Sequence, residues 1–580
     1  MEKYYTDEKN VQVLITLLKE HGIRKIIASP GSANSPIVAS LQYDNYFTMY
    51  SSVDERSAAY MACGLAAESG EPVVISCTGA TASRNYLPGL TEAYYRKLPV
   101  LAITSTQPIT KVGHHNAQVI DHSILPKDVA KLSVTLPIIK GKDDLWDCEI
   151  KVNRAILELK RHGGGPAHIN LSTNSLKTYT TKELPEVRVI DRITSTSEFP
   201  ELPDGKVAVF VGAHAKMSKE QTEVLDRFCA SNNAVVFCDH TSNYKGKYRV
   251  LYSLAACQKM HDLTASRPDI LIHIGEITGD YYSPRIFQKE VWRVSDDGEI
   301  RDTFSKLRYV FEMPEKTFFE HYTKNIEEEK TDYLELCKNH LNELYKIIPE
   351  IPFSNIWLAS KMAHRIPEGS TIHFGILNSL RSWNFFEIPH SVLSASNVGG
   401  FGIDGIISTL FGASLADKNK LYFGVIGDLA FFYDMNVLGN RHIGNNLRIL
   451  LINNGKGTEF SQYDHHVAHF GEYAEEYIAA AGHYGNKSKD LVKHYAQDLG
   501  FEYLCAVDKQ QFEQVYERFL SSEITERSIL FEVFTNNENE SDALKSMMNI
   551  EKNVKGKAKQ IAKQVLGNKG LNVIRNVIRK

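Results

Sequence analysis

The feature that most constrains the fold is an alternation of short apolar runs with helical stretches, repeated in three blocks of the chain. In the first block the β-branched runs KIIASPGS, PVVISCTG and PVLAITST each end in small polar residues, and the Ala-rich stretch ERSAAYMACGLAAES separates two of them. Short strands that alternate with helices are typical of parallel sheets covered by helices. We therefore expect an α/β protein with three doubly wound parallel-sheet domains.

The boundaries of these domains follow from changes in composition. Residues 172–205 are rich in Thr, Ser, Pro and charge, which indicates a linker, and a charged helical stretch precedes the third block. A chain of 580 residues can bury several independent cores. The predicted domains are 1–180, 200–345 and 350–545, followed by a tail at 546–580.

Composition excludes several classes of protein. Lys and Arg total 66 against 70 Asp and Glu, and this near balance argues against a nucleic-acid binder, which needs a basic face. No apolar run approaches the ~18 residues of a membrane span, and the polar N-terminus is unlike a signal peptide. The eight cysteines form no CxxC pair, which excludes a Cys-rich zinc module and suits reduced thiols in a cytoplasm. We expect a cytoplasmic enzyme.

The tail differs from the rest of the chain. Between Glu551 and Lys580 there are nine Lys or Arg residues and one acid, with apolar residues at helical spacing. One interpretation is a solvated terminal helix. The other is a basic amphipathic helix that contacts an anionic membrane surface or a partner protein, which would place the enzyme at the inner face of the membrane.

The third block carries the clearest pattern of chemistry. One strand ends at Gly427 and Asp428, and the next ends at Asn453 and Asn454, about one strand–helix–strand crossover later. Ligands bind at the carboxyl ends of parallel strands, so a carboxylate and an amide oxygen would lie side by side there. Such hard oxygen ligands suit Mg²⁺.

A phosphate group would fit beside this metal. Gly427 and the backbone N–H groups of Leu429 and Ala430 stand at a helix start, where anions bind. Alone, an Asp N-cap and an Asn-Gly turn are common structural features. Their occurrence within one crossover favours the metal and phosphate site.

In the first block, Glu55 stands at the start of the Ala-rich helix. The simplest interpretation is an acid that favours the helix macrodipole.

Together, these features resemble the thiamine-diphosphate-dependent enzymes, and among them most closely the synthases of menaquinone biosynthesis. The similarity covers both ends of residues 1–545 and is weak in the middle. The stretches that carry it are SPGSANSP, VDERSAAYMACGLA, CTGATASRNYLPGLTEA, FGIDGIISTLFGASLA, GDLAFFYDMNVLG and NLRILLINN.

This resemblance implies bound thiamine diphosphate and Mg²⁺. It also implies a pyrimidine-binding domain at 1–180, a central domain at 200–345 and a diphosphate-binding domain at 350–545. A homodimer or homotetramer is expected, because the family holds the two ends of the cofactor with different subunits.

Individual roles also follow from the resemblance. Glu55 matches the catalytic carboxylate that bonds to the aminopyrimidine ring. Asp428 and Asn454 match the Mg²⁺ ligands, with the backbone carbonyl of Lys456 as the third.

Further positions match residues around the cofactor and substrate. Ile403, which follows Gly402, matches the bulky residue beneath the cofactor. Asn378 and Ser379 fall beside the diphosphate and substrate, and Gln118 aligns with an active-site glutamine.

The chain departs from the menaquinone synthases at positions where they carry cations. Because an unpaired carboxylate at such a site costs about 2–5 kcal/mol, we expect retained cofactor chemistry with a different substrate. The residues that replace these cations are Ala33 and Asn34, Trp383 (two residues from Arg381), Val398, and the pair Asp280 and Tyr281.

Other ionisable residues are catalytic candidates. Glu459 stands where the family has an aliphatic residue. It would transfer protons or contact a polar acceptor, and the alternative is a Glu that faces solvent. His114 and His115 are similar to the His pair of pyruvate decarboxylases, with a surface loop as the alternative. Weaker candidates are Lys111, His465, His466 and His469.

The predicted function is a thiamine-diphosphate- and Mg²⁺-dependent 2-oxo-acid decarboxylase or carboligase. Its partners would be a small 2-oxo-acid donor and an unidentified acceptor. The central block lacks GxGxxG, so no flavin or nicotinamide is expected there. The alternatives are the menaquinone synthase itself, which uses 2-oxoglutarate and isochorismate, and a non-catalytic scaffold.

Overall fold

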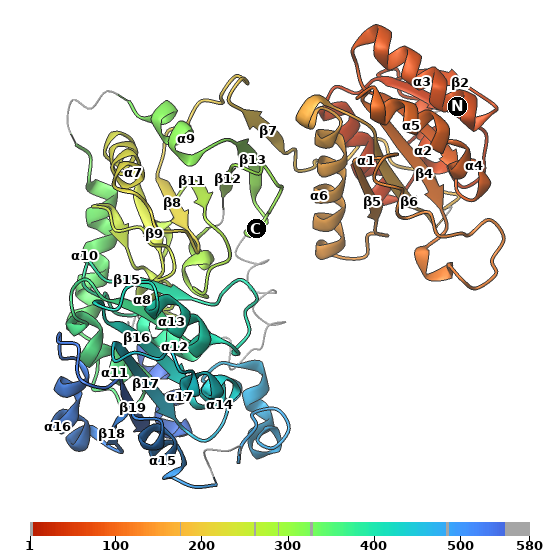
Figure 1. Cartoon of the computed structure of the whole chain (residues 1–580). Helices are drawn as coiled ribbons and strands as arrows, with labels where there is room; N and C mark the ends of the chain where they lie inside the picture. The colour runs from red at the N-terminus through yellow and green to blue at the C-terminus, as the bar shows by residue number, and fades with distance from the viewer. Residues whose placement is uncertain are drawn as a thin grey trace, which may run out of the picture. The chain divides into compact units, whose positions relative to one another are not determined.

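A computed structural model describes residues 4–174, 176–259, 263–287, 289–324, 329–482 and 487–550 (Figure 1). The chain forms two compact units. The first contains Met1–Glu198 and Asp297–Glu312, and the second contains Phe199–Asp296 and Met313–Lys580.

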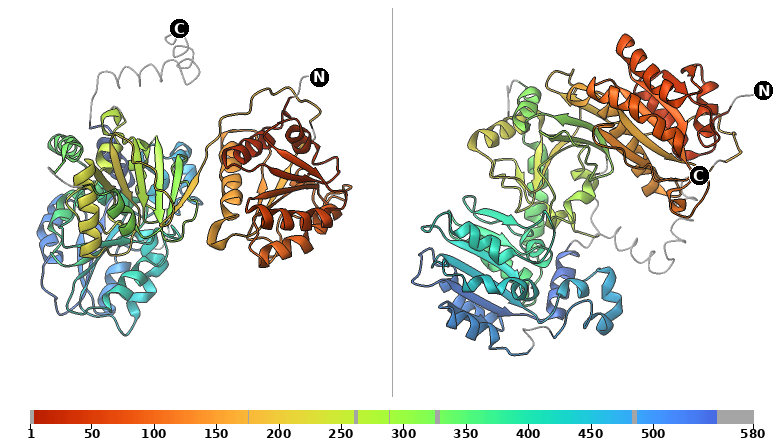
Figure 2. Two further views of the ribbon diagram at one scale, coloured as in Figure 1. Left: turned by 90° about the horizontal axis from the view of Figure 1, so that it is seen from above. Right: turned by 45° about the vertical axis from the view of Figure 1, so that its right-hand side comes forward.

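The first unit is built on a six-stranded parallel sheet in the order β2-β1-β3-β4-β6-β5. Its helices cover both faces of the sheet (Figure 2). The strands are β1 (Lys25–Ala28), β2 (Thr48–Ser51), β3 (Val73–Thr78), β4 (Val100–Thr106), β5 (Leu132–Leu136) and β6 (Ala167–Ser172). The helices are α1 (Lys9–Glu20), α2 (Ser35–Gln42), α3 (Glu55–Ser69), α4 (Thr81–Asn85), α5 (Leu87–Tyr95) and α6 (Lys142–Glu158), with the short turn η1 (Ile109–Lys111).

Helix α3 is fixed by its caps and by small residues. The Asp54 carboxylate accepts the Arg56 N–H, and the helix ends at Gly70 in the left-handed conformation. Its buried alanines lie against α5, where a Cβ on Gly89 would come within 2.4 Å of the Ala59 Cβ. This close packing sets the position of Glu55 at the first turn.

The predicted linker at 172–205 is only partly correct. Its residues Asp191–Thr194 form strand β7, which pairs in parallel with β13 (Leu307–Glu312) of the same unit. Alternation is hard to recognise in so short a strand, because only Ile193 within it is buried.

The second unit contains two parallel sheets. One has the strand run β10-β9-β8-β11-β12, and the other has the order β15-β14-β16-β17-β19-β18. The strands of the former are β8 (Val207–Val211), β9 (Val235–Cys238), β10 (Arg249–Val250), β11 (Ile270–Ile274) and β12 (Glu290–Ser295), with helices α7 (Lys219–Asn232), α8 (Ser253–Ala256), α9 (Glu315–Tyr322) and α10 (Asp332–Lys346).

The strands of the latter sheet are β14 (Thr371–Phe374), β15 (Leu393–Ser396), β16 (Tyr422–Gly427), β17 (Leu447–Asn453), β18 (Glu502–Ala506) and β19 (Ile529–Phe534). Its helices are α11 (Asn355–Met362), α12 (Asn378–Trp383), α13 (Ile406–Ser414), α14 (Asp428–Asp434), α15 (Leu491–Asp498), α16 (Lys509–Phe519) and α17 (Asn537–Met547), with the short turns η7 (Thr458–Ser461) and η8 (His466–Ala474).

All three sheets are parallel and alternate with helices, so the predicted α/β fold class is confirmed. The predicted bounds of the three domains stay a prediction. Residues 551–580 of the predicted tail lie outside the described residues. No described helix is both long and apolar enough to cross a membrane.

Candidate active site

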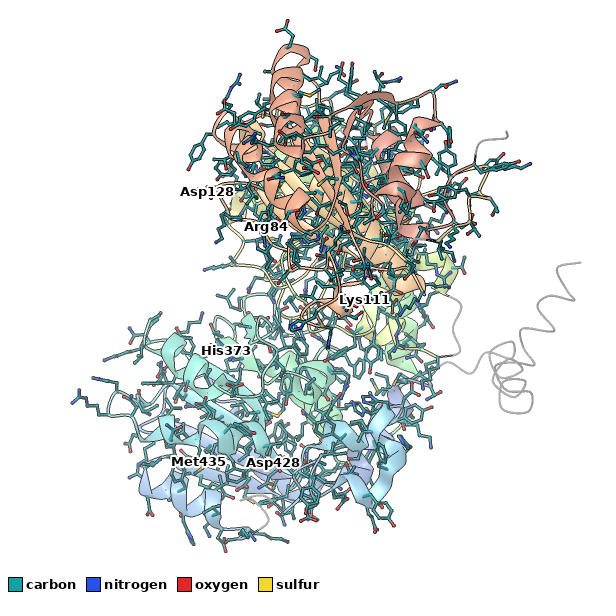
Figure 3. All side chains as sticks on the ribbon, turned by 90° about the vertical axis from the view of Figure 1, so that its right-hand side faces the viewer. Arg84, Lys111, Asp128, His373, Asp428 and Met435 are labelled. Atoms are coloured by element: carbon teal, nitrogen blue, oxygen red, sulfur yellow. The ribbon has the colours of Figure 1, made fainter. Side chains whose placement is uncertain are left out.

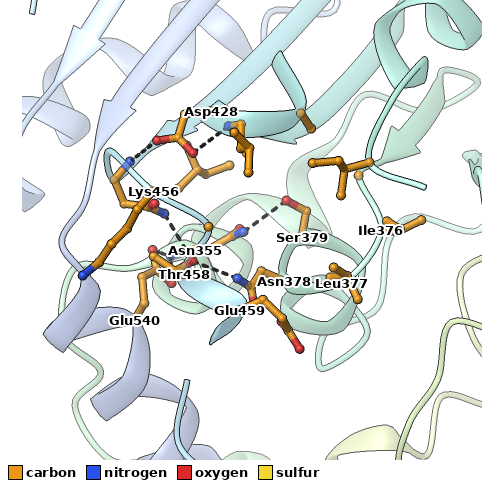
Figure 4. A pocket seen from close by; sticks show the side chains of 18 of the residues that line it. Asn355, Ile376, Leu377, Asn378, Ser379, Asp428, Lys456, Thr458, Glu459 and Glu540 are labelled. Atoms are coloured by element: carbon orange, nitrogen blue, oxygen red, sulfur yellow. Dashed lines mark hydrogen bonds between the residues drawn. The ribbon is translucent and has the colours of Figure 1, made fainter. Parts of the chain in front are cut away.

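A pocket lies at the carboxyl ends of β14, β16 and β17 in the second unit (Figure 4). The strand order reverses between β14 and β16, and crevices at such reversals are where α/β sheets bind ligands. The pocket is lined by Asn355, Gly375, Ile376, Leu377, Asn378, Ser379, Ile403, Gly427, Asp428, Leu429, Ala430, Ile452, Asn454, Lys456, Gly457, Thr458, Glu459, Phe460 and Glu540.

Asp428 joins the ends of two neighbouring strands. Gly427 pairs with Ile452 in the sheet, so the residues after them emerge at the same edge. The buried Asp428 carboxylate accepts the backbone N–H groups of Asn454 at 3.2 Å and Gly455 at 2.6 Å. Burial raises the pKa of Asp428 to about 6, against the opposing effect of the N–H groups.

Asn454 leaves a polar atom unsatisfied beside this carboxylate. Its Nδ2 lies 3.5 Å from the Thr458 hydroxyl, whereas its Oδ1 is buried without a hydrogen-bond partner. A buried carbonyl oxygen without a partner is costly, and a cation would satisfy it. One carboxylate and one free amide oxygen therefore fit a Mg²⁺ ion that keeps other positions for water and phosphate oxygens.

The loop after β17, residues 454–458, is called the metal loop below. The Lys456 side chain pairs with Glu475, so only its backbone is available for the predicted ligand role. Among the residues that the structure describes, no three His, Cys, Asp or Glu side chains cluster as metal ligands. A site here would depend on mixed carboxylate, amide and backbone oxygens.

The turn from β16 into α14 leaves room for a phosphate. A Cβ on Gly427 would meet no heavy atom within 4 Å, so the space above this glycine belongs to the pocket. The Leu429 N–H, which was predicted to bind phosphate, donates instead to Oδ1 of Asp428 at 2.7 Å. Ala430, whose N–H is the other predicted phosphate donor, lines the pocket. Figure 3 shows Asp428 and Met435 near the two ends of α14.

Helix α12 brings Asn378 and Ser379 to the pocket. The Asn378 Nδ2 donates to the Thr458 hydroxyl at 2.8 Å, which ties α12 to the metal loop. Ser379 is buried and accepts the Asn355 Nδ2 at 3.3 Å. Ile403, one residue after Gly402, contributes an apolar wall.

Glu459 forms a nearly buried ion pair. Its carboxylate oxygens accept the two Arg381 terminal nitrogens at 3.0 and 2.5 Å, and the two side chains are 14% and 11% exposed. Arg381 also donates to the Asn378 Oδ1. Glu459 therefore lines the pocket rather than facing solvent, and it neutralises the adjacent cation.

The sequence analysis missed Glu540, Asn355 and Thr458. All three line the pocket, and Glu540 is only 3% exposed. Their positions depend on how α17, α11 and the metal loop pack, and no motif in the sequence marks them.

Glu55 belongs to the first unit. It is half-buried at the start of α3, and its Oε2 accepts the Asn85 Nδ2 at 3.3 Å. Both residues follow strands, Glu55 after β2 and Asn85 after β3. A carboxylate at this helix N-terminus is favoured by the macrodipole.

The other first-unit candidates lie on the segment that follows β4. Gln118, His114 and His115 are exposed, and both Gln118 and His115 have positive φ angles of 62° and 54°. Lys111, labelled in Figure 3, donates to the Gln107 side chain at 2.7 Å.

The weaker histidine candidates surround the start of η8. His465 accepts the Val467 N–H through Nδ1 and stacks on His466 with 4.5 Å between ring centres. His469 bonds through Nδ1 to the His466 carbonyl. None of the three lines the described pocket.

The residues that we expect to replace substrate-binding cations have structural roles in this chain. Trp383 is fully buried, and its indole N–H donates to the Asn355 Oδ1 at 3.2 Å. Val398 is also buried. Asp280 is buried and accepts the Tyr282 N–H at 2.8 Å, which orders a turn.

The same holds in the first unit, where Asn34 is buried and donates to the Ser29 carbonyl at 3.0 Å. Ala33, beside it, has no group that could bind a carboxylate. Tyr281 is partly exposed and meets Phe401 edge to face.

Comparisons with known proteins identify relatives along almost the whole chain. Residues 9–125 match the family model described as thiamine pyrophosphate enzyme, N-terminal TPP binding domain. A protein of Bacteroides fragilis named 2-succinyl-5-enolpyruvyl-6-hydroxy-3-cyclohexene-1-carboxylate synthase is 32% identical over 93% of this chain and 98% of its own length. Proteins of the same name from Bacteroides thetaiotaomicron and Flavobacterium psychrophilum are 32% and 27% identical, over 93% and 90% of this chain and 98% and 95% of their own lengths.

Proposed function

The chain belongs to the family of thiamine-diphosphate enzymes that includes the 2-succinyl-5-enolpyruvyl-6-hydroxy-3-cyclohexene-1-carboxylate synthases, and from this premise we propose that it catalyses the reaction of those synthases. In that reaction 2-oxoglutarate loses CO₂ and its remainder is added to isochorismate. The observation that carries the proposal is the 32% identity over 93% of the chain. This identity favours the reaction of the synthases over our expectation from the sequence, which was the same cofactor chemistry with a different substrate.

The residues of the pocket fit the cofactor. Asp428, the unpartnered Oδ1 of Asn454 and the Lys456 backbone carbonyl would hold Mg²⁺. The open space above Gly427 would receive the diphosphate. Bound thiamine diphosphate would supply a carbon nucleophile and an electron sink for decarboxylation of a 2-oxo acid.

The chain's own residues would orient the reactants and manage protons. The Glu55 carboxylate would exchange a proton with the pyrimidine ring, in place of its present contact with Asn85. The apolar side chains of Ile376, Leu377 and Ile403 would exclude water from the reacting groups. Gln118, His114 and His115 remain candidates for contact with the substrate.

We further propose a homodimer or homotetramer. Exposed apolar side chains on the first unit support this, among them Val53 and Ile124, which are each 80% exposed. A second copy of the chain would cover such residues.

Calorimetric titration of metal-stripped protein with thiamine diphosphate, with and without Mg²⁺, tests the cofactor. A Glu55→Gln variant is assayed beside the native protein for CO₂ release from 2-oxo acids. We expect Mg²⁺-dependent binding and CO₂ release from 2-oxoglutarate by the native protein. The rate of CO₂ release should be at least about a hundredfold lower in the variant. No binding by the native protein would reject the enzyme and leave the non-catalytic scaffold.

A second candidate keeps this cofactor chemistry and changes the substrate. The supporting observation is the Arg381–Glu459 pair, which leaves the cation of α12 already neutralised beside the pocket. The buried Trp383 and Val398 stand at two further positions where the resemblance implies cations.

Glu459→Leu separates the two candidates, because it frees Arg381 to bind a carboxylate. Under the second candidate, the native protein prefers a monocarboxylic 2-oxo acid. The variant then gains about tenfold or more in kcat/KM for 2-oxoglutarate relative to pyruvate. Glu472→Gln, a change of an exposed acid in η8, is the matched control and leaves this ratio unchanged. Efficient use of 2-oxoglutarate and isochorismate by the native protein would reject the second candidate.

We also propose a cytoplasmic location, with contact to an anionic membrane surface through the basic tail. The charge of residues 551–580 supports this contact. Deletion of these residues should abolish sedimentation with anionic liposomes, and unchanged sedimentation would reject the contact.

A further inference from the structure

Glu540 is a buried acid in the wall of the pocket with no assigned role. It lies on α17, is 3% exposed, and lines the same cavity as Asp428 (Figure 4). Asn454 also lines this cavity. A buried carboxyl group costs free energy unless its oxygens find partners. What Glu540 contacts therefore indicates what it does.

Its partners are two neutral donors. The Thr535 hydroxyl donates to Oε1 at 2.7 Å. The backbone N–H of Asn355 lies 3.0 Å from Oε1 and 3.2 Å from Oε2. No ion pair within 4.0 Å reaches the Glu540 carboxyl from the residues that the structure describes.

The contact with Asn355 fixes the start of a second helix. Asn355 is the first residue of α11, and its N–H is one of the donors that a helix leaves unpaired at its N-terminus. Helices α17 and α11 pack against each other, so Glu540 reaches this donor from outside the helix. A carboxyl group at this end is also favoured by the macrodipole.

Asn355 extends this contact to α12. Its Nδ2 donates to the Ser379 hydroxyl at 3.3 Å, and its Oδ1 accepts the Trp383 indole N–H at 3.2 Å. The Asn355 backbone is thus held by Glu540, and its side chain orients two residues of α12. Ser379 in turn lines the pocket.

We propose that Glu540 is a positioning residue for the diphosphate side of the cofactor pocket, acting through Asn355 on Ser379 and α12. The inference rests on the proposed function, because it concerns the binding of thiamine diphosphate. It assigns Glu540 no contact with the cofactor. Its effect is the correct placement of groups that make such contacts.

Charged groups on neighbouring elements affect how Glu540 ionises. Arg381 on α12 favours the carboxylate, and Asp428 on α14 opposes it. Burial has the largest effect and raises the pKa of Glu540 to about 7. Glu459, which also lines the pocket, is already paired with Arg381.

The test measures calorimetric affinity for thiamine diphosphate with Mg²⁺ in the full-length protein. Glu540→Ala should weaken binding by about tenfold or more, since it removes a buried hydrogen-bond acceptor. Glu540→Gln keeps an acceptor oxygen and should bind within about threefold of the native protein. Glu538→Gln alters an exposed acid on the same helix and is the matched control, expected to bind as the native protein does.

Two measurements distinguish positioning from general damage to the fold. At saturating cofactor, Glu540→Ala should recover kcat while its KM for the cofactor stays raised. The losses of affinity in Glu540→Ala and Ser379→Ala should also be less than additive in the double variant, because both act through Asn355. If Glu540→Ala does not fold, Glu540→Asp takes its place. This variant moves the carboxyl group back by one methylene, and we expect it to bind the cofactor more weakly than Glu540→Gln does.

The outcomes separate this inference from the function on which it rests. A folded Glu540→Ala or Glu540→Asp protein that binds as tightly as Glu538→Gln, or fully additive losses in Glu540→Ala and Ser379→Ala, would overturn the positioning role alone. Absence of binding in the native protein would reject the proposed function and this role with it.

Discussion

Asp428 and Glu540 are two buried carboxyl groups in one pocket whose pKa values are raised by the same cause. Burial raises the pKa to about 6 for Asp428 and to about 7 for Glu540. Backbone N–H groups around Asp428 favour its anion, which suits a metal ligand. Among the described residues, Glu540 accepts hydrogen bonds from the Thr535 hydroxyl and the Asn355 N–H, and the effect of burial outweighs these two neutral donors.

This difference predicts how stability depends on pH. The pKa of Glu540 rises from 4.5 to about 7 in the folded state, so its folded form stays protonated where the unfolded chain has released the proton. Its contribution to stability is fully present below pH 4.5 and is lost as the pH rises towards 7, by about 3 kcal/mol in all.

Glu540→Gln removes this titration, so its stability relative to the native protein should increase between pH 4.5 and 7 and then level off. Chemical denaturation at several pH values measures the difference, with Glu538→Gln as the control. A constant difference across this range would contradict a raised pKa at Glu540.

The sequence indicated some of these residues and not others for a physical reason. Asp428 and Asn454 follow neighbouring strands, so their proximity depends only on the strand–helix–strand repeat, which the sequence displays. Glu540 lies near Asn355 because α17 packs on α11, a contact between residues 185 positions apart. Likewise, the partner of Glu459 is 78 residues away, so its exposure could not be judged from its own neighbours.

At the scale of elements, the junction of β16 and α14 builds the part of the pocket where we propose that the diphosphate binds. Gly427 has a φ of −75°, which any residue can adopt. The backbone conformation therefore does not require a glycine here. A Cβ there would also touch no protein atom within 4 Å. The space that the glycine leaves open serves the pocket.

Gly427→Ala should therefore leave stability almost unchanged and weaken thiamine diphosphate binding by about tenfold or more. Gly424→Ala, in the same strand, is the contrasting variant, because its Cβ would lie 2.7 Å from Leu410 Cδ2. It should lower the free energy of unfolding by about 1–3 kcal/mol. Thermal unfolding and calorimetry measure the two effects, and a Gly427→Ala protein with native affinity would contradict a phosphate site here.

The sequence predicted the elements of this junction because long buried strands such as β16 and β17 read as nearly continuous apolar runs. Strand β7 was taken for linker, since it offers one buried residue among four. Short edge strands carry too little pattern to be distinguished from loops.

At the scale of the whole molecule, the candidate residues are divided between the two units. Glu55 belongs to the first unit, whereas Asp428 and the rest of the pocket belong to the second. The resemblance to the thiamine-diphosphate enzymes implies that different subunits hold the pyrimidine and the diphosphate. If this chain does the same, each active site takes Glu55 from one copy and Asp428 from the other.

Mixing two inactive variants tests this arrangement. Glu55→Gln and Asp428→Asn should each be inactive alone. After subunit exchange, random pairing makes about half of the dimers mixed, and each mixed dimer has one site with both native residues and one with neither. Activity should return to about a quarter of the native value.

The same mixture gives a different result if one copy supplies both residues. Every site would then carry one of the two substitutions, and no activity would return at any mixing ratio. A control that mixes Glu55→Gln with a Glu55→Gln, Asp428→Asn double variant should stay inactive in both cases, because no native Glu55 is present. Recovery in the first mixture only, together with a dimer or tetramer by sedimentation, would establish that two copies of the chain build each site.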